Sequence, residues 1–203
     1  MPRARLLVPA LLLAFSLESS TARADEPIVT PGVKSATPPE HQLVQANRFR
    51  LQLRGAEAIL AAARKKAEGM QLNVNIAVVD DGGHLIAFAR MDKARPASGY
   101  TAITKATTAA TFRQATGPLP LNKEPDLLLN LSLQNAAAAS GGKITSLKGG
   151  LPILVAGDVI GAVGVGGGTG EQDAEVAKAG IDAFLAELAQ SGIDISPKPA
   201  TPK

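Results

Sequence analysis

The sequence offers few side chains for covalent or metal chemistry. Its 203 residues include no cysteine and two histidines, His41 and His84. A thiol nucleophile and a thiolate metal site are therefore excluded, and a closed zinc site would have to use carboxylates. No Gly-x-Ser-x-Gly motif supports a Ser-His-Asp triad. Asp80, Asp81 and Asp92 lie near His84 in the sequence, yet aspartates at turns usually bond their own backbone. We assign no catalytic residue and leave open whether the protein is an enzyme.

A glycine-rich segment, residues 161–170, precedes a predicted helix. Backbone amides at a helix start can hold an anion, which makes Gly168, Thr169 and Gly170 candidate anion-binding residues. The segment lacks the Gly-Lys-Ser/Thr end of a phosphate-binding loop and follows a hairpin strand. The alternative is structural: the glycines permit a sharp exit from the sheet, and Thr169 forms a capping box with Gln172. We favour the structural interpretation and keep the anion site as the alternative.

A second candidate element is a predicted helix that carries a stripe of threonines. Lys105 lies on another face of this helix, among alanines. Hydroxyl residues with a branched Cβ are indifferent helix formers, so a stripe of them suggests a polar groove or a contact surface. The alternative is a helix packed through its alanines, with the threonines in water. The stripe consists of Thr101, Thr104, Thr108 and Thr111.

Three side chains have the chemistry of an axial donor to heme iron: His84, Met91 and Tyr100. His84 follows two glycines at the shoulder of a predicted hairpin, where it either contacts a ligand or serves as a turn residue. His41 lies in a proline-rich stretch, and we expect its side chain to be solvated.

The elements that must position these residues follow from hydrophobic periodicity and turn signals. Helices are predicted over residues 56–67, 100–113, 127–139 and 170–188. Strands are predicted over 73–79, 84–90, 151–156 and 159–165, with a further short strand near Ile144. Two hairpins separated by helices predict an α/β protein of the α+β type, with an antiparallel sheet and packed helices. A doubly wound dinucleotide-binding fold is disfavoured.

The first residues have the pattern of an export signal. A basic start, an apolar run from Leu6 to Leu17 and Ala22-Arg23-Ala24 predict a signal peptide over residues 1–24. The apolar run is too short to span a bilayer, so we expect no membrane attachment after cleavage. We expect a flexible leader over 25–47, one folded domain over 48–190 and a loose tail over 191–203. The location would be periplasmic or secreted.

The charge of the mature chain gives no support for nucleic-acid binding. The formal net charge is +3, and removing Arg3, Arg5, Arg23 and Glu18 with the signal subtracts +2 and leaves +1. A nearly neutral protein has no electrostatic attraction to a phosphate backbone.

Four separated segments resemble the GlcG/HbpS family of heme-binding or heme-degrading proteins. They are residues 76–92, 105–109, 149–153 and 161–173, and the resemblance extends over about residues 53–188. It implies a profilin-like three-layer domain with a five-stranded antiparallel sheet, assembly into homo-oligomers and, in some relatives, heme binding. The family's Lys-Ala-x-Thr-Ala motif falls on Lys105 to Ala109, which makes Thr108 and its stripe the expected ligand-facing element. His84 matches a hairpin histidine of the GlcG-like branch.

Three functions follow from these observations. The first is an exported heme-binding protein whose site uses Thr108, His84, Lys105, Arg90 and Met91, with Lys105 or Arg90 paired to a propionate. Aromatic residues make up 3% of the chain and tryptophan is absent, which favours a weak site at a surface or an oligomer interface. The second is an enzyme or accessory factor for a small organic acid, held at the glycine-rich helix start. The third is an extracytoplasmic oligomer that modulates a sensor.

Overall fold

The computed structural model describes residues 48–193. The predicted signal peptide (1–24), the leader (25–47) and residues 194–203 of the predicted tail lie outside the described residues. Each of the eight longer predicted elements is present, with its ends shifted by a few residues at most. Their order is α1 (Leu53–Gly69), β1 (Asn75–Asp80), β2 (Leu85–Arg90), α2 (Ala97–Phe112), α3 (Leu127–Ala139), β3 (Gly150–Val155), β4 (Asp158–Gly166) and α4 (Gly170–Gln190).

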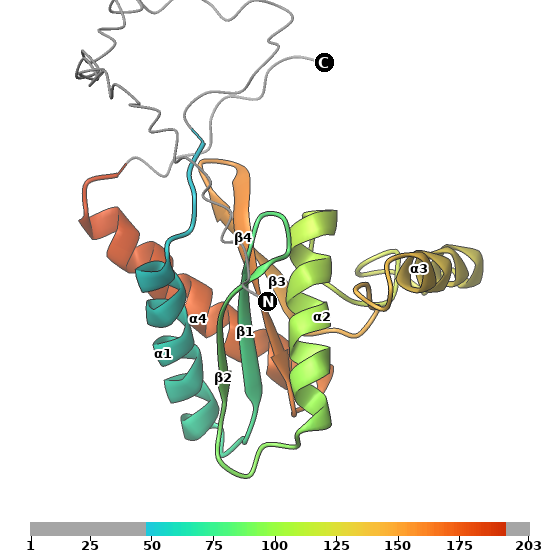
Figure 1. The fold of residues 1–203 in the computed structure, drawn as a ribbon, viewed down its shortest axis with the longest axis horizontal. Coiled ribbons are helices and arrows are strands. Elements are labelled where there is room, and N and C mark those ends of the chain that lie inside the picture. The colour runs from blue at the N-terminus through green and yellow to red at the C-terminus, as the bar shows by residue number, and fades with distance from the viewer. Residues whose placement is uncertain (1–47, 194–203) are drawn as a thin grey trace, which may run out of the picture. The chain divides into compact units, whose positions relative to one another are not determined.

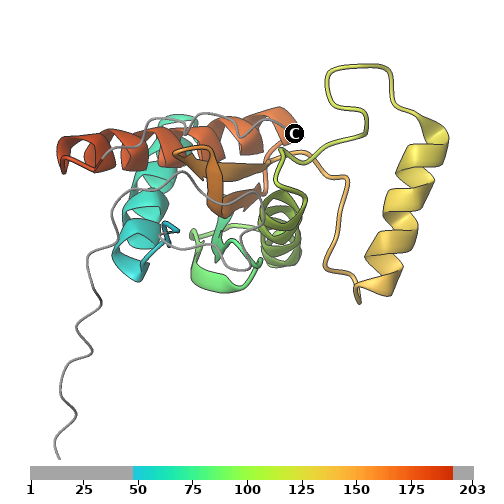
Figure 2. The ribbon, with the colours of Figure 1, turned by 90° about the horizontal axis from the view of Figure 1, so that it is seen from above.

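The four strands form one antiparallel sheet in the order β2-β1-β4-β3. The β1–β2 hairpin and the β3–β4 hairpin therefore lie side by side, joined by the pairing of β1 with β4. Helices α1 and α4 pack on one face and α2 packs on the other (Figures 1 and 2). Helix α3 stands apart from the sheet in both views. None of the helices within residues 48–193 combines the length and hydropathy that a bilayer crossing requires.

The expected fifth strand is not found in the described part of the chain, and the short strand near Ile144 is a wrong prediction. Residues 143–149 have no strand structure. Their backbone groups bond threonine side chains instead: the Thr145 amide donates to Thr108 Oγ1 at 3.0 Å, and Leu147 O accepts from Thr116 Oγ1 at 2.7 Å. Backbone amides and carbonyls that bond side-chain hydroxyls are not available for hydrogen bonds to a neighbouring strand.

The two faces of the sheet bury side chains of different size. Large aliphatic residues, among them Ile59, Ile76 and Val163, fill the layer beneath α1 and α4. The layer beneath α2 is built of small residues, chiefly alanines such as Ala77 and Ala162. Because small side chains let backbones approach, α2 can pack closely against the sheet.

Gly164 of β4 marks the closest approach of α2 to the sheet. A Cβ at this position would lie 2.1 Å from Ala102 O and 2.4 Å from the Ala106 nitrogen, which are backbone atoms of α2. Such atoms cannot move without shifting the helix. Part of the glycine-rich segment therefore serves packing.

We expect Gly164→Ala to lower the free energy of unfolding by about 3 kcal/mol, because the added methyl forces α2 away from β4. The matched control is Gly69→Ala at the end of α1, where a Cβ meets nothing within 4 Å. This change should stabilise the protein by about 0.5–1 kcal/mol through helix propensity. Urea denaturation of both variants measures the difference, and equal small effects would contradict the close packing.

Candidate functional site

A buried ion pair between Lys105 of α2 and Asp173 of α4 is the centre of the candidate site. Lys105 Nζ donates to Asp173 Oδ2 at 2.7 Å and to the carbonyl oxygen of Val165 at 2.8 Å. The two residues are only 4% and 1% exposed. The other carboxylate oxygen, Asp173 Oδ1, accepts from the Gly168 amide at 2.9 Å. This cluster joins α2, the end of β4 and the start of α4.

Gly149, just before β3, completes the walls of the ion pair. A Cβ here would lie 2.6 Å from Asp173 Cβ and 3.0 Å from Lys105 Nζ, and the residue has a φ of +117°. Both the space and the backbone conformation therefore require glycine. Three of the four segments that carry the family resemblance thus meet at one point.

The start of α4 uses its own side chains to bind its first amides. The Thr169 amide donates to Gln172 Oε1 at 2.9 Å, and the Gln172 amide donates to Thr169 Oγ1 at 3.3 Å, which confirms the predicted capping box. The Gly168 amide donates to Asp173. Two of the three amides proposed for an anion, those of Gly168 and Thr169, are therefore already engaged.

A charged group also lies at this helix start. The Glu171 carboxylate accepts a hydrogen bond from its own backbone amide and another from Lys148 Nζ, and these interactions lower its pKa. A negative charge in the first turn of a helix is also favoured by the helix dipole.

A cleft of about 620 Å³ opens beside the ion pair. Its volume lies within the range of about 300–1,000 Å³ that is usual for small-molecule sites. Two exposed cations, Arg95 and Lys148, line it together with the Glu171 carboxylate that accepts from Lys148. The hydroxyls of Ser98 and Thr101 add polar groups. Lys105, Gly168, Gly170 and Asp173 form another part of the lining. The cleft can therefore hold a small ligand that carries carboxylates.

The threonine stripe does not form an open polar groove. Each hydroxyl donates to a carbonyl of its own helix: Thr101 to Ser98 O, Thr104 to Tyr100 O, Thr108 to Thr104 O and Thr111 to Thr107 O. Thr108 is 5% exposed, and its Oγ1 also accepts from the Thr145 amide. The hollow beside Thr108 has a volume of only about 10 Å³. Among the stripe residues, Thr101 lines the large cleft.

The remaining residues of the expected heme site lie elsewhere. The His84 side chain is 84% exposed at the β1–β2 turn, with Nδ1 3.3 Å from the Asp80 carboxylate. Arg90 and Met91 lie at the opposite end of β2, roughly 20 Å away by strand length, and line a different hollow with Asp92. The expected residues thus fall in separate places, and Lys105 is the one that the large cleft includes.

Asp173, Gly149, Arg95 and Lys148 are site residues that the sequence reasoning did not single out. A signal for Asp173 did exist. A lysine on an alanine-lined helix face must be buried, and a buried ammonium requires a carboxylate partner. The acidic residues in the first turn of α4 were candidates for that partner.

Both the sequence and the structure of this chain are similar to those of known proteins. The family described as "Haem degrading protein HbpS-like" matches residues 51–182. The chain belongs to the HbpS-like family. Protein GlcG of Escherichia coli strain K12 is 45% identical over 110 residues, which cover 54% of this chain and 76% of GlcG.

Solved structures of HbpS-like relatives have the same fold. The Klebsiella pneumoniae protein ORFY is 31% identical with a TM-score of 0.62, over 72% of this chain and 99% of ORFY. A structure titled "PduOC:Heme Complex" is 25% identical with a TM-score of 0.54, over 66% of this chain and 95% of the relative. That title concerns the relative, and its ligand enters below only as support for a proposal.

The cleft of this HbpS-like chain fits some parts of a heme and not others. Arg95 and Lys148 match the propionates in charge, and the half-exposed side chain of Leu147 adds apolar surface. The three axial donors expected from the sequence, His84, Met91 and Tyr100, are not among the lining residues. The cleft therefore suits the carboxylates of such a ligand better than its iron.

We expect Lys105→Met to lower the free energy of unfolding by about 3–5 kcal/mol, because it leaves the Asp173 carboxylate buried without its counter-ion. Asp173→Asn should have a similar effect. The double variant Lys105→Met/Asp173→Asn should lose clearly less than the sum of the two single changes. Urea denaturation provides the measurement.

The control for this experiment is Lys178→Ala, which removes an exposed ion pair with Asp182 on α4. Its cost should not exceed about 1 kcal/mol. Equal costs for Lys105→Met and Lys178→Ala would contradict the central role of the buried pair.

Proposed function

We propose that this protein binds a small anionic ligand, foremost heme, in the cleft beside Lys105 and Asp173. The observation that carries the proposal is the meeting of Lys105, Gly168, Gly170 and Asp173, which come from separate segments of the sequence, along one cleft. Membership of the HbpS-like family and the heme complex of a relative favour heme over other anions.

In this proposal the rim and the floor of the cleft have different roles. Arg95 and Lys148 pair with the ligand's carboxylates by charge-assisted hydrogen bonds. Arg95 Nε already donates to Ser98 Oγ at 2.9 Å, which orients its guanidinium. Lys105 and Asp173 neutralise each other and hold the wall rigid. A bound heme would supply redox-active iron. Thr108 and His84, the contacts that the family resemblance implies, do not line this cleft and would meet the iron only if the heme lay elsewhere.

A second candidate ligand is a small organic acid without a metal. It is favoured by one specific observation, namely that none of the predicted axial donors His84, Met91 and Tyr100 lines the cleft. The same two cations, Arg95 and Lys148, would bind its carboxylate. An enzyme or accessory factor acting on such an acid remains our alternative function.

The binding test is a hemin titration of the mature protein, beginning at Asp25, followed by absorbance in the Soret region. We expect saturable, stoichiometric binding. The double variant Arg95→Gln/Lys148→Gln should weaken hemin binding about tenfold, the equivalent of about 1.4 kcal/mol, because the two cations that pair with the heme propionates are removed. Lys178→Gln, on a helix surface away from the cleft, should bind like the parent protein.

The position of the Soret band tests the iron contacts separately. His84→Ala or Thr108→Val should shift the band if either residue meets the iron. Unsaturable hemin binding together with saturable calorimetric binding of glycolate or succinate would favour the organic acid. Binding of neither class would overturn the proposed site.

We also propose that the protein is exported to the periplasm or secreted and assembles into a homo-oligomer. The signal-like pattern of residues 1–24 supports export. Assembly is supported by α3, whose sequence contains no charged residue. Its leucines Leu127 and Leu128 are 73% and 75% exposed, and Leu131 is half exposed. Exposed apolar surface of this kind usually marks an interface. The profilin-like form of the fold also stays a proposal.

We expect Leu128→Gln/Leu131→Gln to shift the mature protein from oligomer towards monomer, because polar amides on α3 no longer gain from burial in an interface. Sedimentation velocity at several protein concentrations measures the shift. Leu53→Gln, which alters a similarly exposed leucine on α1, should leave the oligomer intact. A parent protein that sediments as a monomer at all concentrations would refute the proposal.

A further inference from the structure

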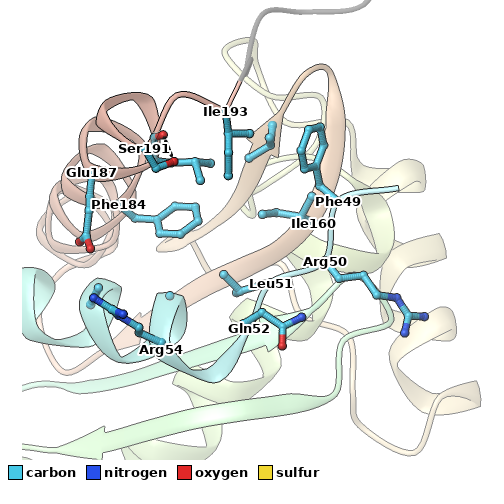
Figure 3. A pocket seen from close by; sticks show the side chains of 14 residues that line it. Phe49, Arg50, Leu51, Gln52, Arg54, Ile160, Phe184, Glu187, Ser191 and Ile193 are labelled. Carbon is cyan, nitrogen blue, oxygen red and sulfur yellow. Dashed lines mark hydrogen bonds between the residues drawn. The ribbon is translucent and has the colours of Figure 1, made fainter. Parts of the chain in front are cut away.

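A second hollow, apolar where the cleft is charged, lies at the end of the domain where α1 begins and α4 ends. Its volume is about 320 Å³. Figure 3 shows Leu51, Ile160 and Phe184 converging on it from three different elements, with Phe49 and Ile193 above them. The chain has only five phenylalanines and no tryptophan, and two of the five line this hollow. None of its lining residues belongs to the lining of the cleft beside Lys105.

The walls of this apolar pocket are fixed by close contacts. Gly55 of α1 lies against Phe184, since a Cβ there would come within 2.9 Å of the phenyl ring. Ile160 and Val155, from the β3–β4 hairpin, are buried in the main core. The small side chain of Ala58 lines the pocket one turn further along α1. The hollow is thus bounded by packed elements on three sides.

The rim of the apolar pocket carries a charge that has no partner in the described structure. Arg54 and Glu187 lie on the same side of the opening, while Arg50 points away from it (Figure 3). Within residues 48–193, Arg54 makes no ion pair of 4 Å or less, with Glu187 or any other carboxylate. Although the Glu187 carboxylate also lines the rim, it does not pair with Arg54, so the Arg54 guanidinium can pair with the anionic end of a ligand whose apolar tail fills the pocket.

We propose that this pocket binds a medium-chain fatty carboxylate, with the alkyl tail among Leu51, Ile160 and Phe184 and the carboxylate beside Arg54. The volume lies near the lower end of the range for small-molecule sites, which suits a single alkyl chain. The site is independent of the cleft, so the protein has two ligand sites of different chemistry.

The test is calorimetric titration of the full mature protein with decanoate below its micelle concentration. Decyltrimethylammonium has a similar tail and the opposite charge, and butyrate has the same head and a short tail. We expect one decanoate per chain, at least tenfold weaker binding of the ammonium compound and no detectable binding of butyrate. Equal binding of decanoate and the ammonium compound would overturn the role of Arg54.

Two variants locate the ligand within the pocket. Arg54→Gln should weaken decanoate about fivefold to tenfold and leave decanol unchanged, whereas Arg64→Gln on the same helix should change neither. Ala58→Phe places a ring in the hollow and should abolish decanoate binding while thermal unfolding shows that the domain still folds. Undiminished decanoate binding by a folded Ala58→Phe variant would overturn the proposal. Failure of the parent protein to bind decanoate would also overturn it, and would indicate that other residues of the chain or a second copy fill the pocket.

The hemin titration separates this proposal from the proposed function. Ala58→Phe should bind hemin like the parent protein. If the parent protein binds hemin but not decanoate, the fatty-carboxylate site alone is refuted. If it binds decanoate but not hemin, the heme site alone is refuted.

Discussion

The rest of the site depends on the burial of one ammonium group. Lys105 and Asp173 are both removed from water, and such charges are tolerated only when they are paired and their remaining hydrogen-bonding groups are satisfied. The structure meets this condition with Val165 O on the lysine and the Gly168 amide on the carboxylate. The end of β4, the first turn of α4 and the middle of α2 must therefore keep fixed positions. The cleft is the space that remains beside this fixed junction.

The small-residue layer beneath α2 makes that junction possible. The Lys105 side chain can bond both Asp173 of α4 and Val165 O at the end of β4 only if α2 lies close to the sheet. Gly164 and the alanines of α2 provide the close approach, and Gly149 leaves room for the Nζ atom. The glycine-rich segment thus has a packing role along β4 and a turn role before α4. Its amides at Gly168 and Thr169 are bound within the protein, so two of the three donors proposed for an anion are already engaged.

Local sequence signals were sufficient for the elements and insufficient for the site. Periodicity and turn residues located all four helices and both hairpins, and the Thr169–Gln172 capping box followed from a spacing of three residues. The hydroxyl bonds of the threonine stripe are also local, because each joins a residue to a carbonyl three or four positions earlier, and they could have been anticipated. The Lys105–Asp173 pair joins residues 68 positions apart, and the bonds that replace a strand near Ile144 join Thr108 to Thr145. Tertiary contacts of this kind leave no local pattern.

The position of the family-like segments explains why the resemblance bears more directly on the fold than on the ligand. Lys105, Gly149, Gly164 and Asp173 all lie within those segments, and the structure uses them to pair charges and to bring backbones together. Residues with such roles specify an architecture whatever the cleft contains. Arg95 and Lys148, the exposed cations that a ligand would meet, lie outside the family-like segments. Under the proposed function, the choice of ligand would depend on these rim residues, because they can change without disturbing the buried pair.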